Sequence, residues 1–112
     1  MVRRIALVST DGKVINQHFG RAVHFNIVDI CDQSYEVIEQ RDTAPVCSGY
    51  AHDDDALAHT VQKLSDCSAV FAAKIGQGAV NALQAAGIRA FEAPGAVEDI
   101  LVQIIAEHVL DD

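Results

Sequence analysis

The unbroken apolar run Ile5-Ala6-Leu7-Val8 constrains the fold of this chain more than any other feature of its sequence. A strand with one face in water alternates apolar and polar residues, whereas consecutive apolar residues are typical of a central strand covered on both faces. A second such run spans residues 69–73, between two segments with helical spacing. Strands that alternate with helices indicate parallel strands joined by helical crossovers. We therefore expect an α/β fold with helices on both faces of the sheet.

The other segments complete a βββαβαβα order. Residues 24–30 and 35–41 are expected to be strands, and the short polar break between them predicts an antiparallel hairpin. The charged residues of the second of these strands suit the edge of a sheet. Further elements are expected as a helix from Asp53, a strand at 69–73, a helix at 78–86, a strand at 88–91 and a helix at 97–108. This order predicts a five-stranded mixed sheet in a single domain that spans residues 1–112.

Acidic residues outnumber basic ones, 16 to 8, which gives the chain a net charge of −8. Nucleic-acid-binding proteins normally carry a basic surface and anionic membranes attract basic segments, so neither partner is expected. No apolar run approaches the roughly 20 residues of a membrane-spanning helix. The cysteine count is odd, at three, and the apolar stretch near Met1 is too short for an export signal. We therefore expect reduced thiols and a cytoplasmic location.

The segment Asn16-Gln17-His18-Phe19-Gly20-Arg21 lies in the loop between the first two expected strands. The imidazole of His18 is a ligand type for iron, zinc or copper, Gly20 would let the backbone approach a bulky ligand, and Arg21 would neutralise an anion. On spacing alone, an ordinary turn with a solvated histidine explains the same residues. This loop and the segment from Lys74 to Gly78 are both expected to leave the carboxyl ends of central parallel strands, where the ligands of such sheets collect.

Cys47 and His52 share the loop that precedes the first expected helix. Thiolate and imidazole suit iron–sulfur species or copper, whereas a closed structural zinc site needs four ligands that these residues do not complete. A loop cysteine beside a helix-capping segment explains the pattern equally well. Cys31 and Cys67 lie beside strands and are expected to be small core residues. His24 begins a strand near the His18 loop and is a candidate spare ligand or hydrogen-bond partner of one.

Residues 74–79, Lys-Ile-Gly-Gln-Gly-Ala, run from an expected strand into a helix, where backbone N–H groups bind anions. Asn81 stands in place of the third glycine of a dinucleotide fingerprint, and the segment has no Gly-Lys-Ser/Thr, which excludes a Walker loop. A generic anion site or a tight turn fits these residues better than a nucleotide site. The sequence has no Ser-His-Asp pattern, nucleophile elbow or cluster of carboxylates, so no catalytic residue is predicted.

Taken together, the motifs resemble those of the dinitrogenase iron–molybdenum cofactor-binding family, meaning NifX-like and NafY-like proteins and the C-terminal domain of NifB. The resemblance covers nearly the whole chain and rests on residues 5–9, on Asn16-Gln17-His18-Phe19-Gly20 followed by Phe25 and Ile27, and on residues 73–79 leading to Ala86-Gly87-Ile88. It implies a ribonuclease H-like fold and a non-catalytic protein that carries an iron–sulfur precursor or the finished cofactor towards nitrogenase. It also implies that His18, the histidine of His-Phe-Gly, takes part in cofactor binding. Cys47-Ser48-Gly49 is similar to a Cys-x-Gly element of some members, without the second cysteine of that loop.

The leading hypothesis is a cytoplasmic carrier of an iron–sulfur metallocluster, the iron–molybdenum cofactor or its precursor, with nitrogenase assembly proteins as candidate partners. The alternative is a small mononuclear metal-binding or regulatory protein of the same fold. The candidate metal ligands are His18, Cys47 and His52. The candidate cofactor-binding residues are His18, Phe19, Gly20, Arg21, Cys47, Lys74 and Gly76.

Overall fold

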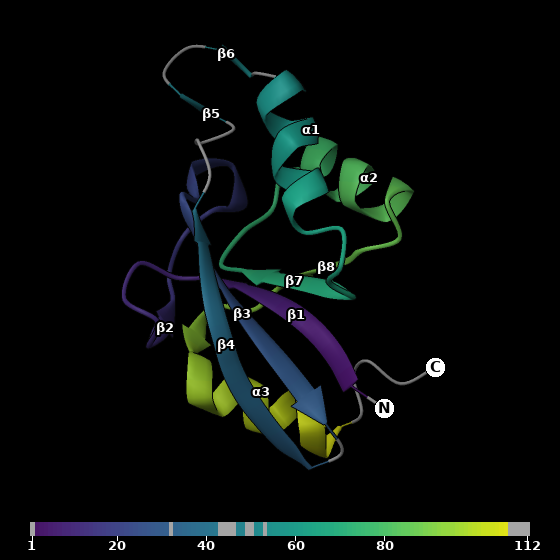
Figure 1. Ribbon diagram of the computed structural model, residues 1–112. Coiled ribbons are helices and arrows are strands. Elements are labelled where there is room, and N and C mark those ends of the chain that lie inside the picture. Colours follow the sequence, from purple (N-terminus) through teal and green to yellow (C-terminus); the bar gives the residue numbers. More distant parts are fainter. Residues whose placement is uncertain (1, 32, 43–46, 49–50, 53, 108–112) are drawn as a thin grey trace.

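A computed structural model describes residues 2–31, 33–42, 47–48, 51–52 and 54–107 of the chain (Figure 1). Its centre is a five-stranded sheet in the order β4-β3-β1-β7-β8. The strands are β1 (Val2–Val8), β3 (His24–Cys31), β4 (Ser34–Asp42), β7 (Ala69–Ala72) and β8 (Arg89–Glu92). The helices are α1 (Asp54–Lys63), α2 (Gln77–Ala85) and α3 (Val97–Ala106). The expected α/β fold with a five-stranded sheet is confirmed.

Strand directions make the sheet mixed. β1, β7 and β8 run parallel to one another, and β3 is antiparallel to both of its neighbours, β1 and β4. The predicted β3–β4 hairpin is therefore present, and β4 lies at the edge of the sheet as its charges indicated. The three parallel strands end at the same edge, so the segments that follow them are brought together there.

The central strand β1 is buried on both faces, as its apolar run predicted. Ala6 and Val8 belong to a core that α1 and α2 cover, whereas Ile5 and Leu7 belong to a second core under α3. In Figure 1, α1 and α2 lie together on one side of the sheet and α3 lies on the other. The apolar stripe of α3 contributes Val97, Leu101 and Ile104 to the second core. The helix expected at 97–108 ends at Ala106 with Glu107 as its C-cap residue, and residue 108 lies outside the described residues.

Four very short strands were not predicted. β2 (Val14–Ile15) pairs with β9 (Gly95–Ala96), and β5 (Cys47–Ser48) pairs with β6 (Ala51–His52). Two residues carry too little periodicity to be recognised in a sequence. The β2–β9 pair ties the loop after β1 to the segment before α3, since the Val97 N–H also donates to the Lys13 carbonyl at 2.9 Å. None of the helices described is long and apolar enough to cross a membrane.

Candidate functional site

Two loops meet at the carboxyl edge of the parallel strands. The Ala73 N–H donates to the Gln17 carbonyl at 3.0 Å, and the Phe19 N–H donates to the Lys74 carbonyl at 2.9 Å. His18 and Lys74 form an isolated parallel bridge between these bonds. We call residues 17–21 and 73–76 the rim. The expectation that the His18 loop and the segment from Lys74 leave the same end of the sheet is therefore confirmed.

His18 is exposed to solvent, and the next residue is not. The Phe19 side chain has no exposed surface and packs edge-on against Phe25, with ring centroids 5.7 Å apart. Phe19 begins a short 3-10 helix, η1 (Phe19–Arg21), which closes with the Arg21 N–H donating to the His18 carbonyl at 3.1 Å. The buried phenylalanine anchors the loop, so the imidazole of His18 stands on a fixed backbone. Phe19, named above as a candidate cofactor-binding residue, has no side-chain surface to offer a ligand.

Basic groups flank the histidine on both loops. Arg21 and Lys74 are exposed, and neither side chain forms a hydrogen bond or ion pair with any other residue of the described segments. Within the described part of the chain, both cations are therefore available to a negatively charged ligand. In a chain with a net charge of −8, they provide local positive charge at the rim.

Helix α2 starts at the rim without a side-chain cap. Gly76 is its N-cap residue and makes no capping bond, which leaves first-turn N–H groups open to an acceptor. Gly76 has a φ of −65°, and an added Cβ at Gly76 or Gly78 would meet nothing within 4 Å. Neither backbone strain nor packing explains these two glycines. Their small size keeps the space at the start of α2 open.

Glu92, the last residue of β8, reaches the rim from the neighbouring strand. Its Oε2 accepts the Ile75 N–H at 2.9 Å. Sequence reasoning missed this residue, because it placed the end of the last strand at Phe91. An acidic residue immediately after a parallel strand was the signal that could have indicated it, since such residues reach the edge where ligands collect.

The segment with the other two candidate ligands lies close to the rim. In the β5–β6 pair, Cys47 and His52 are direct backbone partners, and β5 lies beside η1. Residues opposite one another in an antiparallel pair have Cα atoms about 4.5–5.5 Å apart. The side chains of Cys47 and His52 fall outside what the structure describes. Among the described residues, no three His, Cys, Asp or Glu side chains converge as a metal site.

The remaining thiols lie at the opposite end of the sheet from the rim, whereas His24 begins β3 three residues after η1. Cys67 is buried as expected, and burial raises the pKa of its thiol to about 12. Cys31 is exposed, which corrects the expectation of a core residue, because it lies at the end of β3 where the hairpin turns. His24 forms a contact of 2.7 Å with Asp42 through its Nδ1. The hydrogen bond to His24 lowers the pKa of the Asp42 carboxyl.

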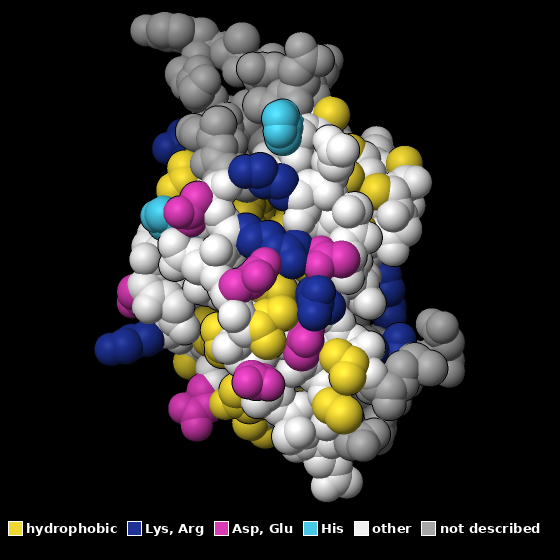
Figure 2. Space-filling view, in the orientation of Figure 1, with side chains coloured by type: hydrophobic (Ala, Val, Ile, Leu, Met, Phe, Trp, Pro, Cys, Tyr) yellow, Lys and Arg dark blue, Asp and Glu magenta, His cyan; other side chains and the backbone are white. Residues whose placement is uncertain are grey.

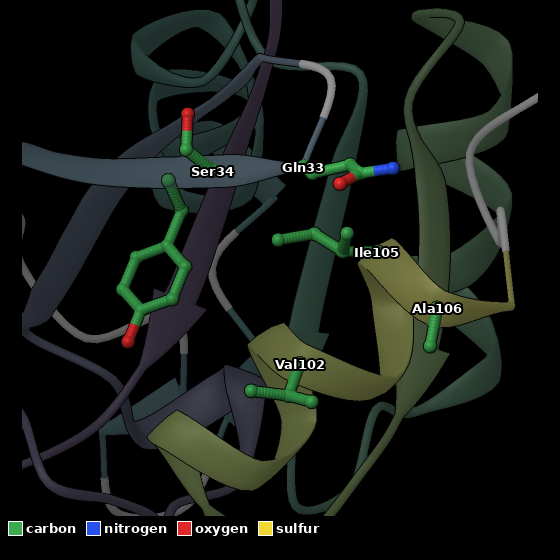
Figure 3. A pocket seen from close by; sticks show the side chains of 6 residues that line it. Gln33, Ser34, Val102, Ile105 and Ala106 are labelled. Atoms are coloured by element: carbon green, nitrogen blue, oxygen red, sulfur yellow. The ribbon is translucent and has the colours of Figure 1, made fainter.

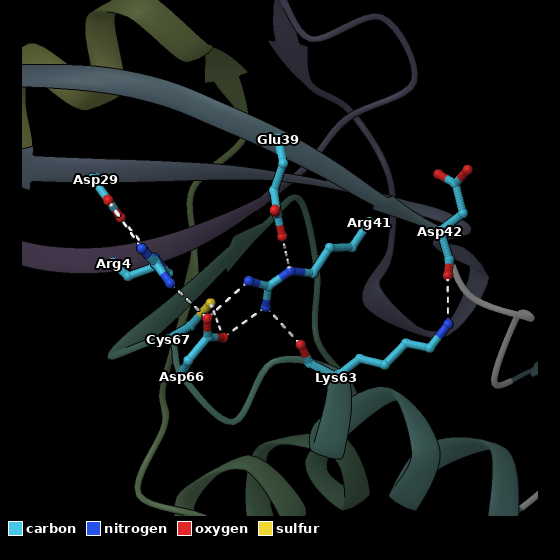
Figure 4. A network of polar contacts seen from close by, with 8 residues as sticks. All are labelled: Arg4, Asp29, Glu39, Arg41, Asp42, Lys63, Asp66 and Cys67. Atoms are coloured by element: carbon cyan, nitrogen blue, oxygen red, sulfur yellow. Dashed lines mark hydrogen bonds and ion pairs between the residues drawn. The ribbon is translucent and has the colours of Figure 1, made fainter.

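An ion-pair network covers the sheet face next to α1 (Figure 4). Arg4 donates to Asp29 and to Asp66, at 2.8 Å each, and Arg41 donates to Asp66 at 2.6 and 2.8 Å. Arg41 also pairs with Glu39 and donates to the Lys63 carbonyl at 2.7 Å. Figure 2 shows the resulting alternation of basic and acidic side chains over this face. The basic and acidic groups of this network therefore pair with one another.

A hollow of about 580 Å³ lies far from the rim, between the β3–β4 turn and the end of α3 (Figure 3). In Figure 3, Val102 and Ile105 of α3 face the hairpin residues across this groove. Its described lining is mostly apolar and contains no charged residue; it consists of Gln33, Ser34, Tyr35, Val102, Ile105 and Ala106. These residues include none of the ionic or imidazole side chains that usually bind a metal.

Comparisons with known proteins agree with the resemblance drawn from the motifs. The sequence profile described as "Dinitrogenase iron-molybdenum cofactor" matches residues 1–107. The FeMo cofactor biosynthesis protein NifB of Frankia alni is 36% identical over 110 residues, which cover 96% of this chain and 22% of that protein. The chain thus spans about a fifth of the length of the NifB relatives it matches.

Shorter proteins are similar over most of their length. Protein NifX of Sinorhizobium fredii is 28% identical over 104 residues, which cover 88% of this chain and 65% of NifX. The apo form of the orange protein from Desulfovibrio gigas superposes with a TM-score of 0.67 at 25% identity, covering 95% of this chain and 88% of that one. With its profile matched over residues 1–107, the chain belongs to the dinitrogenase iron–molybdenum cofactor family.

Proposed function

We propose that this chain binds an iron–sulfur metallocluster, the iron–molybdenum cofactor or its precursor, as cargo during nitrogenase cofactor biosynthesis. The observation that carries the proposal is an exposed imidazole, His18, whose backbone is fixed at the rim between two basic residues that pair with no other residue of the described segments. The family is named for this cofactor, and its NifB relatives are named for the biosynthesis of the same cofactor.

The residues of the rim suit such cargo chemically. His18 supplies a nitrogen ligand for iron, while Arg21, Lys74 and the uncapped start of α2 offset the negative charge of a cluster. Gly20 and Gly76 let the backbone come close to a bulky guest. A carrier must release what it binds, so one or two protein ligands suit it better than a closed set of four. The rim thus supports a non-catalytic binding role.

Cys47 is proposed as a second ligand, with His52 as its alternative. The backbone pairing of these residues beside η1 supports their proximity to His18. The same pairing favours a second candidate function, a mononuclear metal-binding or regulatory protein that uses His18, Cys47 and His52. Metal analysis of anaerobically purified protein separates the two functions. Iron with stoichiometric sulfide supports the carrier, and a single zinc or copper ion supports the alternative.

The wider assignments follow from the same proposal. Nitrogenase assembly proteins are the proposed partners and the cytoplasm is the proposed location. The ribonuclease H-like classification is also proposed, and the sheet order β4-β3-β1-β7-β8 with β3 antiparallel to its neighbours supports it.

Substitution of His18 tests the proposal. We expect His18→Ala to weaken binding of the isolated cluster by at least about tenfold in an anaerobic titration, because an iron ligand is lost. His59→Ala is the matched control, since His59 is exposed on α1 and has no place in the rim. Equal affinity of His18→Ala and the unmodified protein would refute the assignment of His18.

A further inference from the structure

We infer that Glu92 is a positioning residue of the rim that also limits how tightly anionic cargo is held. Its carboxylate fixes the turn between β7 and α2, and its negative charge opposes the charge of the cargo. The inference rests on the proposed function and adds to it a residue that sets retention and release.

Glu92 lies where it can act on the turn directly. It is the last residue of the edge strand β8, and its backbone partner in β7 is Ala72. The Ala93 N–H donates to the Ala72 carbonyl at 2.8 Å, which continues the pairing of these segments past the strand end. From this fixed backbone, the carboxylate Oε2 reaches the Ile75 N–H at 2.9 Å.

Among the described residues, three hydrogen bonds hold the turn, and the one to Glu92 is made through a side chain. The other two join backbone groups, Ala73 N–H to Gln17 carbonyl and Phe19 N–H to Lys74 carbonyl. Ile75 is only 6% exposed, and its buried side chain anchors the turn to the hydrophobic core. The Glu92 bond orients the peptide that links Lys74 to this anchor. Loss of the bond would leave Lys74 and the start of α2 less well fixed beside His18.

The charge of Glu92 acts in the opposite direction. Its carboxylate accepts the N–H of Ile75, the residue that follows Lys74, so a negative charge stands beside the loop that would hold the cargo. Like charges repel, and this repulsion is weakened by salt. A carboxylate therefore combines an acceptor that orders the site with a charge that speeds release. Glutamine at this position would keep the acceptor and remove the charge.

Two substitutions separate these effects. The probe is a synthetic four-iron iron–sulfur cluster with thiolate caps, titrated anaerobically at low and high salt. We expect Glu92→Gln to bind the cluster about threefold more tightly and release it more slowly, with the gain shrinking at high salt. We expect Glu92→Ala to bind at least about threefold more weakly than Glu92→Gln at both salt concentrations. Glu36→Gln, which removes the same charge from an exposed position on β4, should leave affinity unchanged.

A cargo-free measurement tests the positioning role separately. Exchange of the Ile75 amide hydrogen should be faster in Glu92→Ala than in the unmodified protein and nearly unchanged in Glu92→Gln. Equal cluster affinity for Glu92→Gln and Glu92→Ala, or a gain in Glu92→Gln that salt does not reduce, would overturn the inference. If instead His18→Ala binds as tightly as the unmodified protein, the proposed function fails, whatever the Glu92 variants show.

Discussion

At the scale of single residues, side chains that are adjacent in the sequence lie in opposite environments, one buried and the other exposed. Phe19 is fully buried while His18 is exposed, and Cys67 is buried while Asp66 beside it joins the ion pairs. Burial of an ionisable group disfavours its charged form, because the charge loses contact with water. The chemistry of each side chain is therefore set by its environment as much as by its type.

The two thiols Cys31 and Cys67 should differ sharply in reactivity. The thiolate is the reactive form, and a pKa raised to about 12 leaves Cys67 almost entirely protonated at pH 8. Iodoacetamide should therefore label the exposed Cys31 and leave Cys67 unmodified in the folded protein. Peptide mapping by mass spectrometry after a timed reaction provides the measurement. Labelling in urea, where both thiols are accessible, is the control, and equal labelling rates in buffer would contradict this prediction.

At the scale of elements, the two ends of α2 differ in how well they are stabilised. Its first turn contains Gly78, which lowers helix stability relative to alanine, and its N-cap Gly76 makes no side-chain bond. At its other end, Gly87 adopts a φ of +80° and the Ile88 N–H returns to the Leu83 carbonyl at 2.8 Å, which stops the helix firmly. The C-terminal end of α2 is thus held by a backbone hydrogen bond, whereas its N-terminal end at the rim has no side-chain cap.

Gly78→Ala should raise the stability of the protein and lower its affinity for the cluster. We expect the variant to unfold at higher urea concentration, by about 0.5 kcal/mol, because alanine is the better helix former. The added methyl group would occupy open space at the start of α2, so cluster affinity should fall. Gln84→Ala, at an exposed position near the end of α2, should leave affinity unchanged. Unaltered cluster binding by Gly78→Ala would show that cargo does not approach this helix start.

The main elements were predictable because each carries a pattern of its own. The apolar run of β1, the stripe of α3 and the polar break before β4 act over neighbouring residues and can be read without knowing the fold. The join between His18 and Lys74 was predicted only as far as a shared sheet edge, because backbone hydrogen bonds between distant loops leave no local pattern. The hydrogen bond from the Ile75 N–H to Glu92 was missed for the same reason.

At the scale of the whole molecule, the ion-pair network links segments that are distant in sequence. Arg4 lies on β1, Asp29 on β3 and Arg41 on β4, and all are joined through or beside Asp66, which follows α1. Hydrogen bonds from Arg41 and then Arg4 hold the pKa of the Asp66 carboxyl well below its usual range. A carboxyl with a depressed folded-state pKa contributes stability above its unfolded-state pKa, and that stability is lost as the pH falls through the folded-state value.

Asp66→Asn should therefore lower stability and flatten its dependence on acid pH. We expect a loss of about 1 kcal/mol at pH 7, since partly exposed ion pairs are screened by solvent. Below about pH 4, where the unmodified protein progressively loses this contribution, the difference between the two proteins should narrow. Urea unfolding at a series of pH values measures both effects. Asp99→Asn, an exposed acid of α3 outside the network, is the control, and a difference that persists unchanged into strong acid would contradict the prediction.

The rim and the glutamate that contacts it come from three stretches of the chain, with residues 17–21 after β1, residues 73–76 after β7 and Glu92 at the end of β8. β7 fills the place in the sheet between β1 and β8, so these stretches become neighbours only when the later strands have docked. During synthesis, His18 leaves the ribosome long before Lys74 and Glu92 exist. On the proposed function, a metallocluster would therefore bind only after β8 has joined the sheet, and a short peptide containing the histidine motif would not reproduce the site.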